Sequence, residues 1–194
     1  MRKIAMSAAF AAMVVAPTGS FAQTIPGAVV AVVDLEKVSS DCTACKSAKA
    51  ALEGQVNALK SREAALAAPL KTEGEALQKA VQALNGKEPD AALQARIKAF
   101  QTKQQSGAQE IARQTNQIQR NQAYVSQQIS TKLGPIYQQV MQRRGANIMV
   151  EAGATLAAGS SLDVTNDVLS ALNQQLPSVA TTAPAAPQQQ PQGR

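Results

Sequence analysis

The sequence predicts a mostly α-helical protein in which a long coiled-coil hairpin protrudes from a small, few-stranded β-body that acts as an oligomerisation platform. Three observations predict this fold class. Apolar residues recur at coiled-coil spacing over two long stretches, short β-branched runs stand on either side, and large core residues are scarce, with no Trp, no His, three Phe and two Tyr in 194 residues. Because such a chain buries little area per residue, its stability has to come from helices packed lengthwise and from association between copies.

Residues 1–22 are predicted to be a secretory signal peptide. Arg2 and Lys3 precede an apolar run from Ile4 to Ala16, and small residues stand at the cleavage-determining positions of Ser20-Phe21-Ala22. The run is shorter than the roughly 20 residues of a membrane-spanning helix. We therefore expect export across the inner membrane, a mature chain that begins near Gln23 and a periplasmic location.

Residues 23–40 and 145–176 are predicted to form the β-body. The run from Ala28 to Leu35 is apolar and β-branched, as in a strand buried on both faces, and Asn147 to Glu151 with Ala154 to Leu156 indicates two further strands around a turn. A short helix follows, with Asp163 and Thr165 as its candidate caps. These strands are too few and too short to form a stable sheet alone, so we expect copies to associate through them. The residues expected to do so are Val30, Val32, Val33, Ile148 and Val150.

Residues 41–144 are predicted to form the helical hairpin, beginning after the capping residues Ser39-Ser40-Asp41. In its first half the apolar residues recur in steps of three, four and seven: Leu52, Val56, Leu59, Leu66, Leu70, Leu77, Val81 and Leu84. Pro69 lacks a backbone donor and crowds the preceding turn, so a kink is expected there, with a full break as the alternative. Asn85-Gly86 and Pro89-Asp90 indicate a helix end and a new helix start, which places the tip near residues 85–90.

The returning helix has the same spacing in its apolar residues, which are Leu93, Ile97, Phe100, Ile111, Ile118, Val125, Ile129, Leu133, Ile136 and Val140. The glutamine-rich stretch from Gln101 to Gln128 retains helix propensity without adding a continuous apolar face. At about 1.5 Å per residue, arms of this length reach roughly 60 to 80 Å. After the body, residues 177–194 contain Pro, Ala, Gln and Thr with almost no large apolar side chain and are predicted to be disordered.

The formal net charge of +6 is spread unevenly. No acidic residue occurs from Ile111 to Val150, although basic residues continue through that stretch. A solvated helix face would explain this excess, and so would attraction to acidic segments or to anionic lipid at a membrane surface; both explanations stay open. Nucleic acid is not expected as a partner of an exported protein.

Cys42 and Cys45 form a C-x-x-C pair at the start of the first arm helix. In an oxidising compartment we expect a disulfide. Thiol–disulfide chemistry is the alternative, but no thioredoxin-like βαβ pattern surrounds the pair, and two cysteines without histidine would leave a zinc site half empty unless subunits shared it. The sequence offers no histidine base, nucleophile elbow or glycine-rich phosphate loop, so neither an enzyme nor a bound cofactor is expected.

The order and spacing of these elements resemble the Skp/OmpH family of periplasmic chaperones. Three stretches carry the resemblance: Val30 to Val38 is similar to the family's opening strand and turn, Lys46 to Leu59 to its first arm, and Leu162 to Leu169 to its closing Asp-x-Thr helix. The resemblance implies a homotrimer whose strands form a central β-body and whose hairpins enclose unfolded outer-membrane proteins. The C-x-x-C pair departs from the family pattern.

On this resemblance, the expected function is a holding chaperone that prevents aggregation of unfolded outer-membrane proteins without ATP. The candidate residues for contact with such clients are Ile97, Phe100, Ile111 and Ile118. The main alternative is an exported structural coiled-coil adaptor that binds one folded partner. An adaptor should have an unbroken apolar seam, whereas this one is interrupted by Glu63, Glu73, Gln104 and Gln114.

Overall fold

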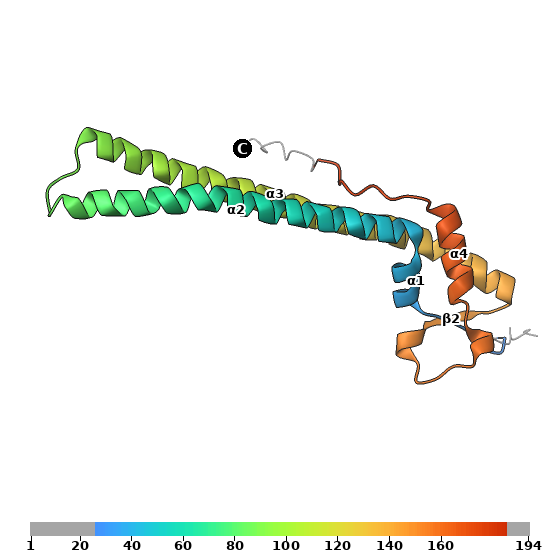
Figure 1. The fold of residues 1–194 in the computed structure, drawn as a ribbon. Helices are drawn as coiled ribbons and strands as arrows, with labels where there is room; N and C mark the ends of the chain where they lie inside the picture. Colours follow the sequence, from blue (N-terminus) through green and yellow to red (C-terminus); the bar gives the residue numbers. More distant parts are fainter. Residues whose placement is uncertain (1–25, 186–194) are drawn as a thin grey trace, which may run out of the picture.

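A computed structural model describes residues 26–185, so the predicted signal peptide lies outside the described residues. A two-helix arm extends from a small body of strands and short helices (Figure 1). In chain order the elements are β1 (Val30–Val33), α1 (Leu35–Asp41), α2 (Thr43–Ala83), α3 (Ala91–Arg144), β2 (Ile148–Glu151), the 3-10 turns Ala152–Ala154 and Ser160–Leu162, and α4 (Thr165–Gln175). The prediction of a mostly helical chain with a long hairpin on a small sheet is confirmed.

The sheet of the body contains two parallel strands, and the whole arm connects them. Val30 lies opposite Ile148 and Val33 opposite Glu151. Parallel neighbours cannot be joined by a tight turn, and here the crossover is the hairpin itself. The further strand predicted at residues 154–156 is wrong, because the chain forms a 3-10 turn at Ala152–Ala154 and then has no strand partner among the described residues. Alanine and glycine offer little side-chain packing to a strand, which explains the difference.

The core of the body lies where the two ends of the arm meet α1 and α4. Its fully buried side chains are Val38, Cys42, Ile136, Val140, Val168 and Leu172. These residues come from α1, the α1–α2 junction, the last turns of α3 and α4. The base of the arm is therefore part of the hydrophobic core, and the rest of the arm projects from it.

The arm helix α2 begins at Thr43, as expected after Ser39-Ser40-Asp41, but these three residues belong to a separate helix, so the chain forms two helices here. The first, α1, begins directly after the strand, because the Asp34 carboxylate accepts a hydrogen bond from the Lys37 N–H at 2.8 Å. The backbone leaves the helical region at Cys42, with φ −56° and ψ 126°, and α2 starts at the next residue. Asp41 does not cap a helix; it pairs with the Lys37 ammonium at 2.6 Å, and the hydrogen bond from that lysine lowers the pKa of Asp41.

The arm consists of one uninterrupted helix in each direction. The 41 residues of α2 continue through Pro69, so the break considered at that proline does not occur. The 54 residues of α3 likewise continue through Pro135. At about 1.5 Å per residue these helices are roughly 60 and 80 Å long, as the sequence predicted.

Left-handed residues mark the ends of both arm helices. Asn85 (φ 48°) and Gly86 (φ 85°) turn the chain at the tip, and the Asp90 carboxylate then caps α3 by accepting from the Leu93 N–H at 2.8 Å. At the base, Gly145 (φ 67°) ends α3. Glycine adopts such angles without strain and asparagine tolerates them better than most residues, which is why these turns were visible in the sequence.

The chain beyond α4 returns along the arm (Figure 1). We expected residues 177–194 to be disordered, but residues 179–183 pack on the arm and form hydrogen bonds with side chains of α2 and α3. The expectation considered only apolar burial, whereas this segment is held through its backbone N–H and C=O groups. Residues 186–194 lie outside the described part of the chain.

Candidate functional site

Two ion pairs cross between α2 and α3 along the arm. The Arg62 guanidinium donates to both carboxylate oxygens of Glu110, at 2.7 and 3.0 Å, and nearer the tip Arg96 donates to Glu73 at 3.0 Å. The hydrogen bond from Arg62 is the largest cause of the lowered pKa of Glu110. Exposed pairs of this kind contribute little stability. The two ion pairs do show which residues of α2 and α3 face each other. Glu73 also interrupts the apolar seam, as the sequence indicated.

Asn121 is a buried polar residue in the middle of the arm. Its side chain is only 3 % exposed, its amide donates to the Gln55 side chain at 2.7 Å, and its Oδ1 accepts from Gln117 at 2.8 Å. A single buried asparagine in a coiled coil commonly fixes the pairing register. Asn121 was not among the predicted site residues, although its position three residues after Ile118 and four before Val125 places it in the apolar seam.

Small residues bring the two helices close at two points farther along the arm. A Cβ added at Gly74 would lie 3.3 Å from the ring of Phe100, and one added at Gly107 would lie 3.8 Å from Leu66. The Phe100 ring therefore packs over Gly74, a partner that the sequence analysis did not identify. It also lines a groove together with Leu77 and Val81.

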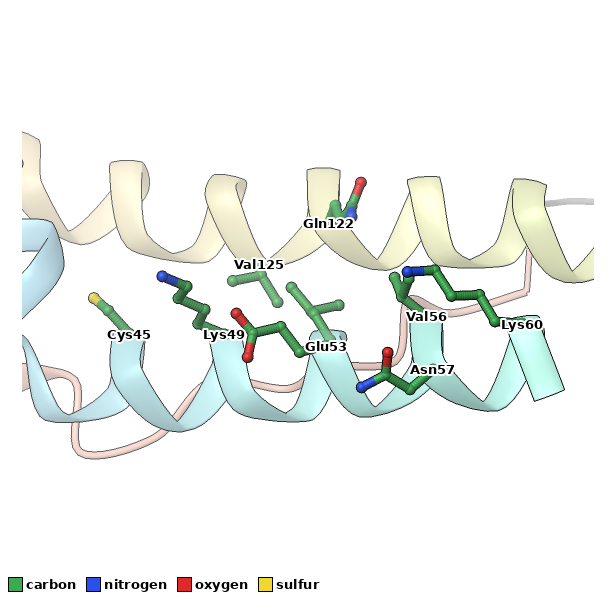
Figure 2. Close-up of a pocket in the computed structure, with 9 residues that line it drawn as sticks. Cys45, Lys49, Glu53, Val56, Asn57, Lys60, Gln122 and Val125 are labelled. Carbon is green, nitrogen blue, oxygen red and sulfur yellow. The ribbon is translucent and has the colours of Figure 1, made fainter.

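Open grooves run along the arm between these contacts. The groove nearest the body has a volume of about 500 Å³ and lies between α2 and α3 (Figure 2). Its apolar lining comes from Leu52, Val56 and Val125, and charged side chains of α2 stand around it, among them Lys49 and Glu53. Such a surface offers both apolar and polar contacts, without the enclosure of a small-molecule pocket.

The predicted client-contact residues are distributed along α3. Ile97 and Phe100 line a distal groove of about 420 Å³, whereas Ile111 lines a different, mostly apolar groove of about 500 Å³ in the middle of the arm. Ile118 is half-buried and lies farther toward the body. The structure therefore does not bring the four residues together into one site. Whether they contact a client stays a prediction.

The body also has exposed apolar side chains. Ile148 is 42 % exposed and Leu156 is fully exposed, whereas Val32 and Val33 are already buried within the chain. The carbonyl of Val32 accepts from the Val164 N–H at 2.9 Å, on the side of β1 away from β2, so the open edge of the sheet belongs to β2. If copies associate through the body, Ile148 offers the free side chain and β2 the free backbone edge.

The Asp-x-Thr pattern at the start of α4 has a structural role. The Thr165 hydroxyl accepts a hydrogen bond from the Asp34 N–H at 2.9 Å, and its own N–H donates to the Asp163 carboxylate at 2.8 Å. Hydrogen bonds from Thr165 are the main cause of the lowered pKa of Asp163. This buried threonine thus joins the end of β1 to the start of α4. The expectation that Asp163 and Thr165 cap the helix is wrong, because Val164 holds the N-cap position and no side chain caps it, and the link to Asp34 was not predicted.

Cys42 and Cys45 form a disulfide at the junction of α1 and α2, with their Cα atoms 5.1 Å apart. The Cys42 Sγ also accepts a hydrogen bond from the Cys45 N–H at 3.1 Å, so it caps the start of α2. Cys42 is fully buried and Cys45 nearly so. The bond is therefore covered by the core of the body, which is a poor position for exchange with another protein's thiols.

Between residues 26 and 185 no group of three or more His, Cys, Asp or Glu side chains is arranged to hold a metal ion. In the same part of the chain no helix is both long enough and apolar enough to cross a membrane.

The described residues thus form a long hairpin with shallow grooves, rooted in a small body. The model of the family described as outer membrane protein (OmpH-like) matches residues 29–172, which is most of the chain. The chain belongs to this family, the OmpH/Skp outer membrane protein chaperones, as the resemblance implied. The family is not one of enzymes, in agreement with the expectation from sequence.

The fold is also found in a solved structure. A crystal structure from Caulobacter crescentus CB15, of a protein provisionally described as an outer membrane chaperone (OmpH-like), matches with a TM-score of 0.68 at 17 % sequence identity. The match covers 88 % of this chain and 99 % of the other. At this identity the likeness establishes the fold alone. No curated protein matches the sequence.

Proposed function

We propose that the protein is a periplasmic holding chaperone, which binds unfolded outer-membrane proteins along its arm and prevents their aggregation without ATP. The observation that carries the proposal is the series of shallow grooves spread over the length of α2 and α3. Membership of the OmpH-like family supports it, and so does the description of the Caulobacter crescentus protein as an outer membrane chaperone.

The physical basis is a distributed surface. An unfolded client has to be kept from self-association without being folded, so many weak contacts serve better than one specific pocket. The grooves supply apolar walls for client side chains. Ion pairs such as Arg62 with Glu110 interrupt the apolar seam between the two helices, so it is not continuous. The basic excess on α3 would add attraction for acidic client segments or anionic lipid, and this attraction would weaken with salt.

The proposal includes the domain organisation and the location. The proposed units are a cleaved signal peptide (residues 1–22), the oligomerising body (23–40 and 145–176), the arm (41–144) and a tail (177–194). The charged start and apolar run of the first unit support export to the periplasm.

The direct test is to dilute a urea-unfolded outer-membrane β-barrel into buffer with and without the purified protein and to follow light scattering. We expect suppression of scattering at near-stoichiometric amounts, without added nucleotide. Aggregation that proceeds unchanged at a several-fold excess of the protein would reject the holding function.

Assembly is the next prediction. The sheet has only two strands, one open edge and an exposed Ile148, so copies are expected to associate, as a trimer by family resemblance. Multi-angle light scattering at micromolar concentration should report about three chains. An Ile148→Asp variant should shift the distribution toward single chains, and Leu156→Asp is its control for an exposed apolar residue outside the strands. A wild-type monomer at this concentration would contradict the prediction.

Replacing both Cys42 and Cys45 with serine is expected to leave client holding unchanged within error. A serine hydroxyl at position 42 can still accept the N–H of residue 45, and the buried hydroxyls together with loss of the disulfide should lower the melting temperature only modestly. Thermal unfolding by circular dichroism and the scattering assay measure the two effects. A double variant with normal helix content that no longer holds clients would favour thiol chemistry instead.

Phe100→Ala distinguishes a holding chaperone from an adaptor. If contacts are distributed, removing this half-buried ring costs roughly a factor of ten or less in client affinity. Leu77→Ala, which alters the facing helix in the same groove, is the matched control for packing. Complete loss of binding in Phe100→Ala alone, with helix content and oligomeric state unchanged, would indicate a localised recognition site and favour the adaptor.

A further inference from the structure

The tail that follows α4 is bound to the arm by side-chain amides. Gln128 forms two hydrogen bonds with the backbone of one tail residue. Its amide nitrogen donates to the Ala180 carbonyl at 2.8 Å, and its amide oxygen accepts from the Ala180 N–H at 3.0 Å. A single glutamine thereby satisfies both backbone groups of one extended residue. This geometry depends on the peptide unit and does not require a particular side chain at position 180.

Two more amides continue the same pattern on the next residues. Gln55 of α2 donates to the Thr181 carbonyl at 3.1 Å, and the Oδ1 of Asn121 accepts from the Ala183 N–H at 2.8 Å. Because Asn121 also donates to Gln55 at 2.7 Å, the two amides orient each other. The backbone of the tail therefore meets a row of amides that comes from both helices.

The side chains of the tail add little to this contact. Ala180 and Thr182 are exposed, and Val179 is the residue whose side chain packs on the hydrophobic core. Recognition is thus mostly of extended backbone, which every unfolded polypeptide offers. The tail also lies beyond residue 172, where the match to the family model ends, so it is an addition to the matched hairpin and body.

We propose that Gln55, Asn121 and Gln128 form a binding site for extended polypeptide backbone, which the chain's own residues 179–183 occupy and which a segment of an unfolded client takes in their place. The inference rests on the proposed holding function. Only a few residues separate the tail from α4, so its effective concentration at the site is of millimolar order, and it excludes weakly binding segments. A client that engages several grooves at once displaces it.

The test releases the tail without altering the arm. Ala180→Pro combined with Ala183→Pro removes the two backbone N–H donors, and Ala180→Ser with Ala183→Ser is the control that keeps them. Hydrogen exchange of residues 177–185, followed by mass spectrometry, reports release. We expect faster exchange in the proline variant and exchange close to the wild-type rate in the serine variant.

The site itself is measured with a fluorescent peptide of the sequence of residues 177–185. It should bind the proline variant at least about tenfold more tightly than the wild type, whose own tail competes with it. In the proline variant, Gln128→Leu should abolish peptide binding, whereas Gln127→Leu, at the exposed neighbouring position, should not. Equal peptide affinity for the Gln128→Leu and Gln127→Leu variants would reject the site.

Client binding completes the test. The proline variant should bind an unfolded outer-membrane barrel several-fold more tightly than the wild type and the serine variant, and unlabelled peptide should compete with the client. Unchanged or weaker client affinity in a variant whose tail is released would overturn the proposal while leaving the holding function intact. If neither the wild type nor the variants hold clients, the proposed function fails, and so does the proposal that a client replaces the tail. The peptide measurements still decide whether the backbone site exists.

Discussion

Shortening the arm by two heptads in each helix is expected to weaken client holding by about tenfold or more, because the walls of the middle and distal grooves are lost. Residues 63–76 and 97–110 are suitable for removal, since the Arg62–Glu110 and Glu73–Arg96 pairs show that these segments face each other. Each helix becomes about 21 Å shorter. Fourteen residues are two full heptads, so the apolar seam rejoins in register. Client affinity and light scattering measure the loss.

A graded series provides the control for this deletion. Removing one heptad from each helix, residues 63–69 and 104–110, should give an intermediate loss, whereas helix content per residue and oligomeric state should stay as in the wild type. Full holding by the protein that lacks both heptads would show that the distal arm is dispensable, and it would confine client binding to the body and the proximal groove.

Leu172→Ala is expected to destabilise the protein by about 2 to 5 kcal/mol. The side chain is completely buried in α4 and belongs to the same core as Val38, Ile136 and Val168, so its removal leaves a cavity between the base of the arm and the body. Thermal and urea unfolding, followed by circular dichroism at one fixed protein concentration, measure the loss.

The matched control is Leu156→Ala, which shortens the same residue type at a fully exposed position. It should change the free energy of unfolding by less than about 0.5 kcal/mol. A Leu172→Ala protein as stable as the control would mean that α4 does not hold the arm to the body, and that the stability of the chain lies mainly in the arm itself.

The arm was predictable because its signals are local. Apolar residues at steps of three, four and seven indicate two helices that pack lengthwise, and Asn85-Gly86 supplies the left-handed residues that the tip needs. Membership of the OmpH-like family was likewise indicated by the order of the elements. The start of α1 was missed because Asp34, at the end of an apolar strand, was not considered as a helix cap.

The site was only partly predictable. The four candidate residues of α3 do line or adjoin the seam, but their distribution among separate grooves depends on where Gly74 and Gly107 let the helices approach. Asn121 could have been found from its place in the heptad. Its bond to Gln55 could not, because Gln55 precedes it by 66 residues and a hydrogen bond over that separation has no local signature.

What the sequence determined by itself is therefore the set of elements: a strand, two long helices with a tight tip, a second strand and a short closing helix. Each follows from spacing or turn chemistry within a few residues. What only the tertiary structure decided is how distant segments meet: the parallel pairing of β1 with β2 across the whole arm, the bond from Asp34 to Thr165, and the course of the tail. The tail illustrates the physical reason. A segment without large apolar residues has no periodicity to detect, and its order comes from backbone groups that find amide partners once the hairpin has brought Gln55 and Gln128 together.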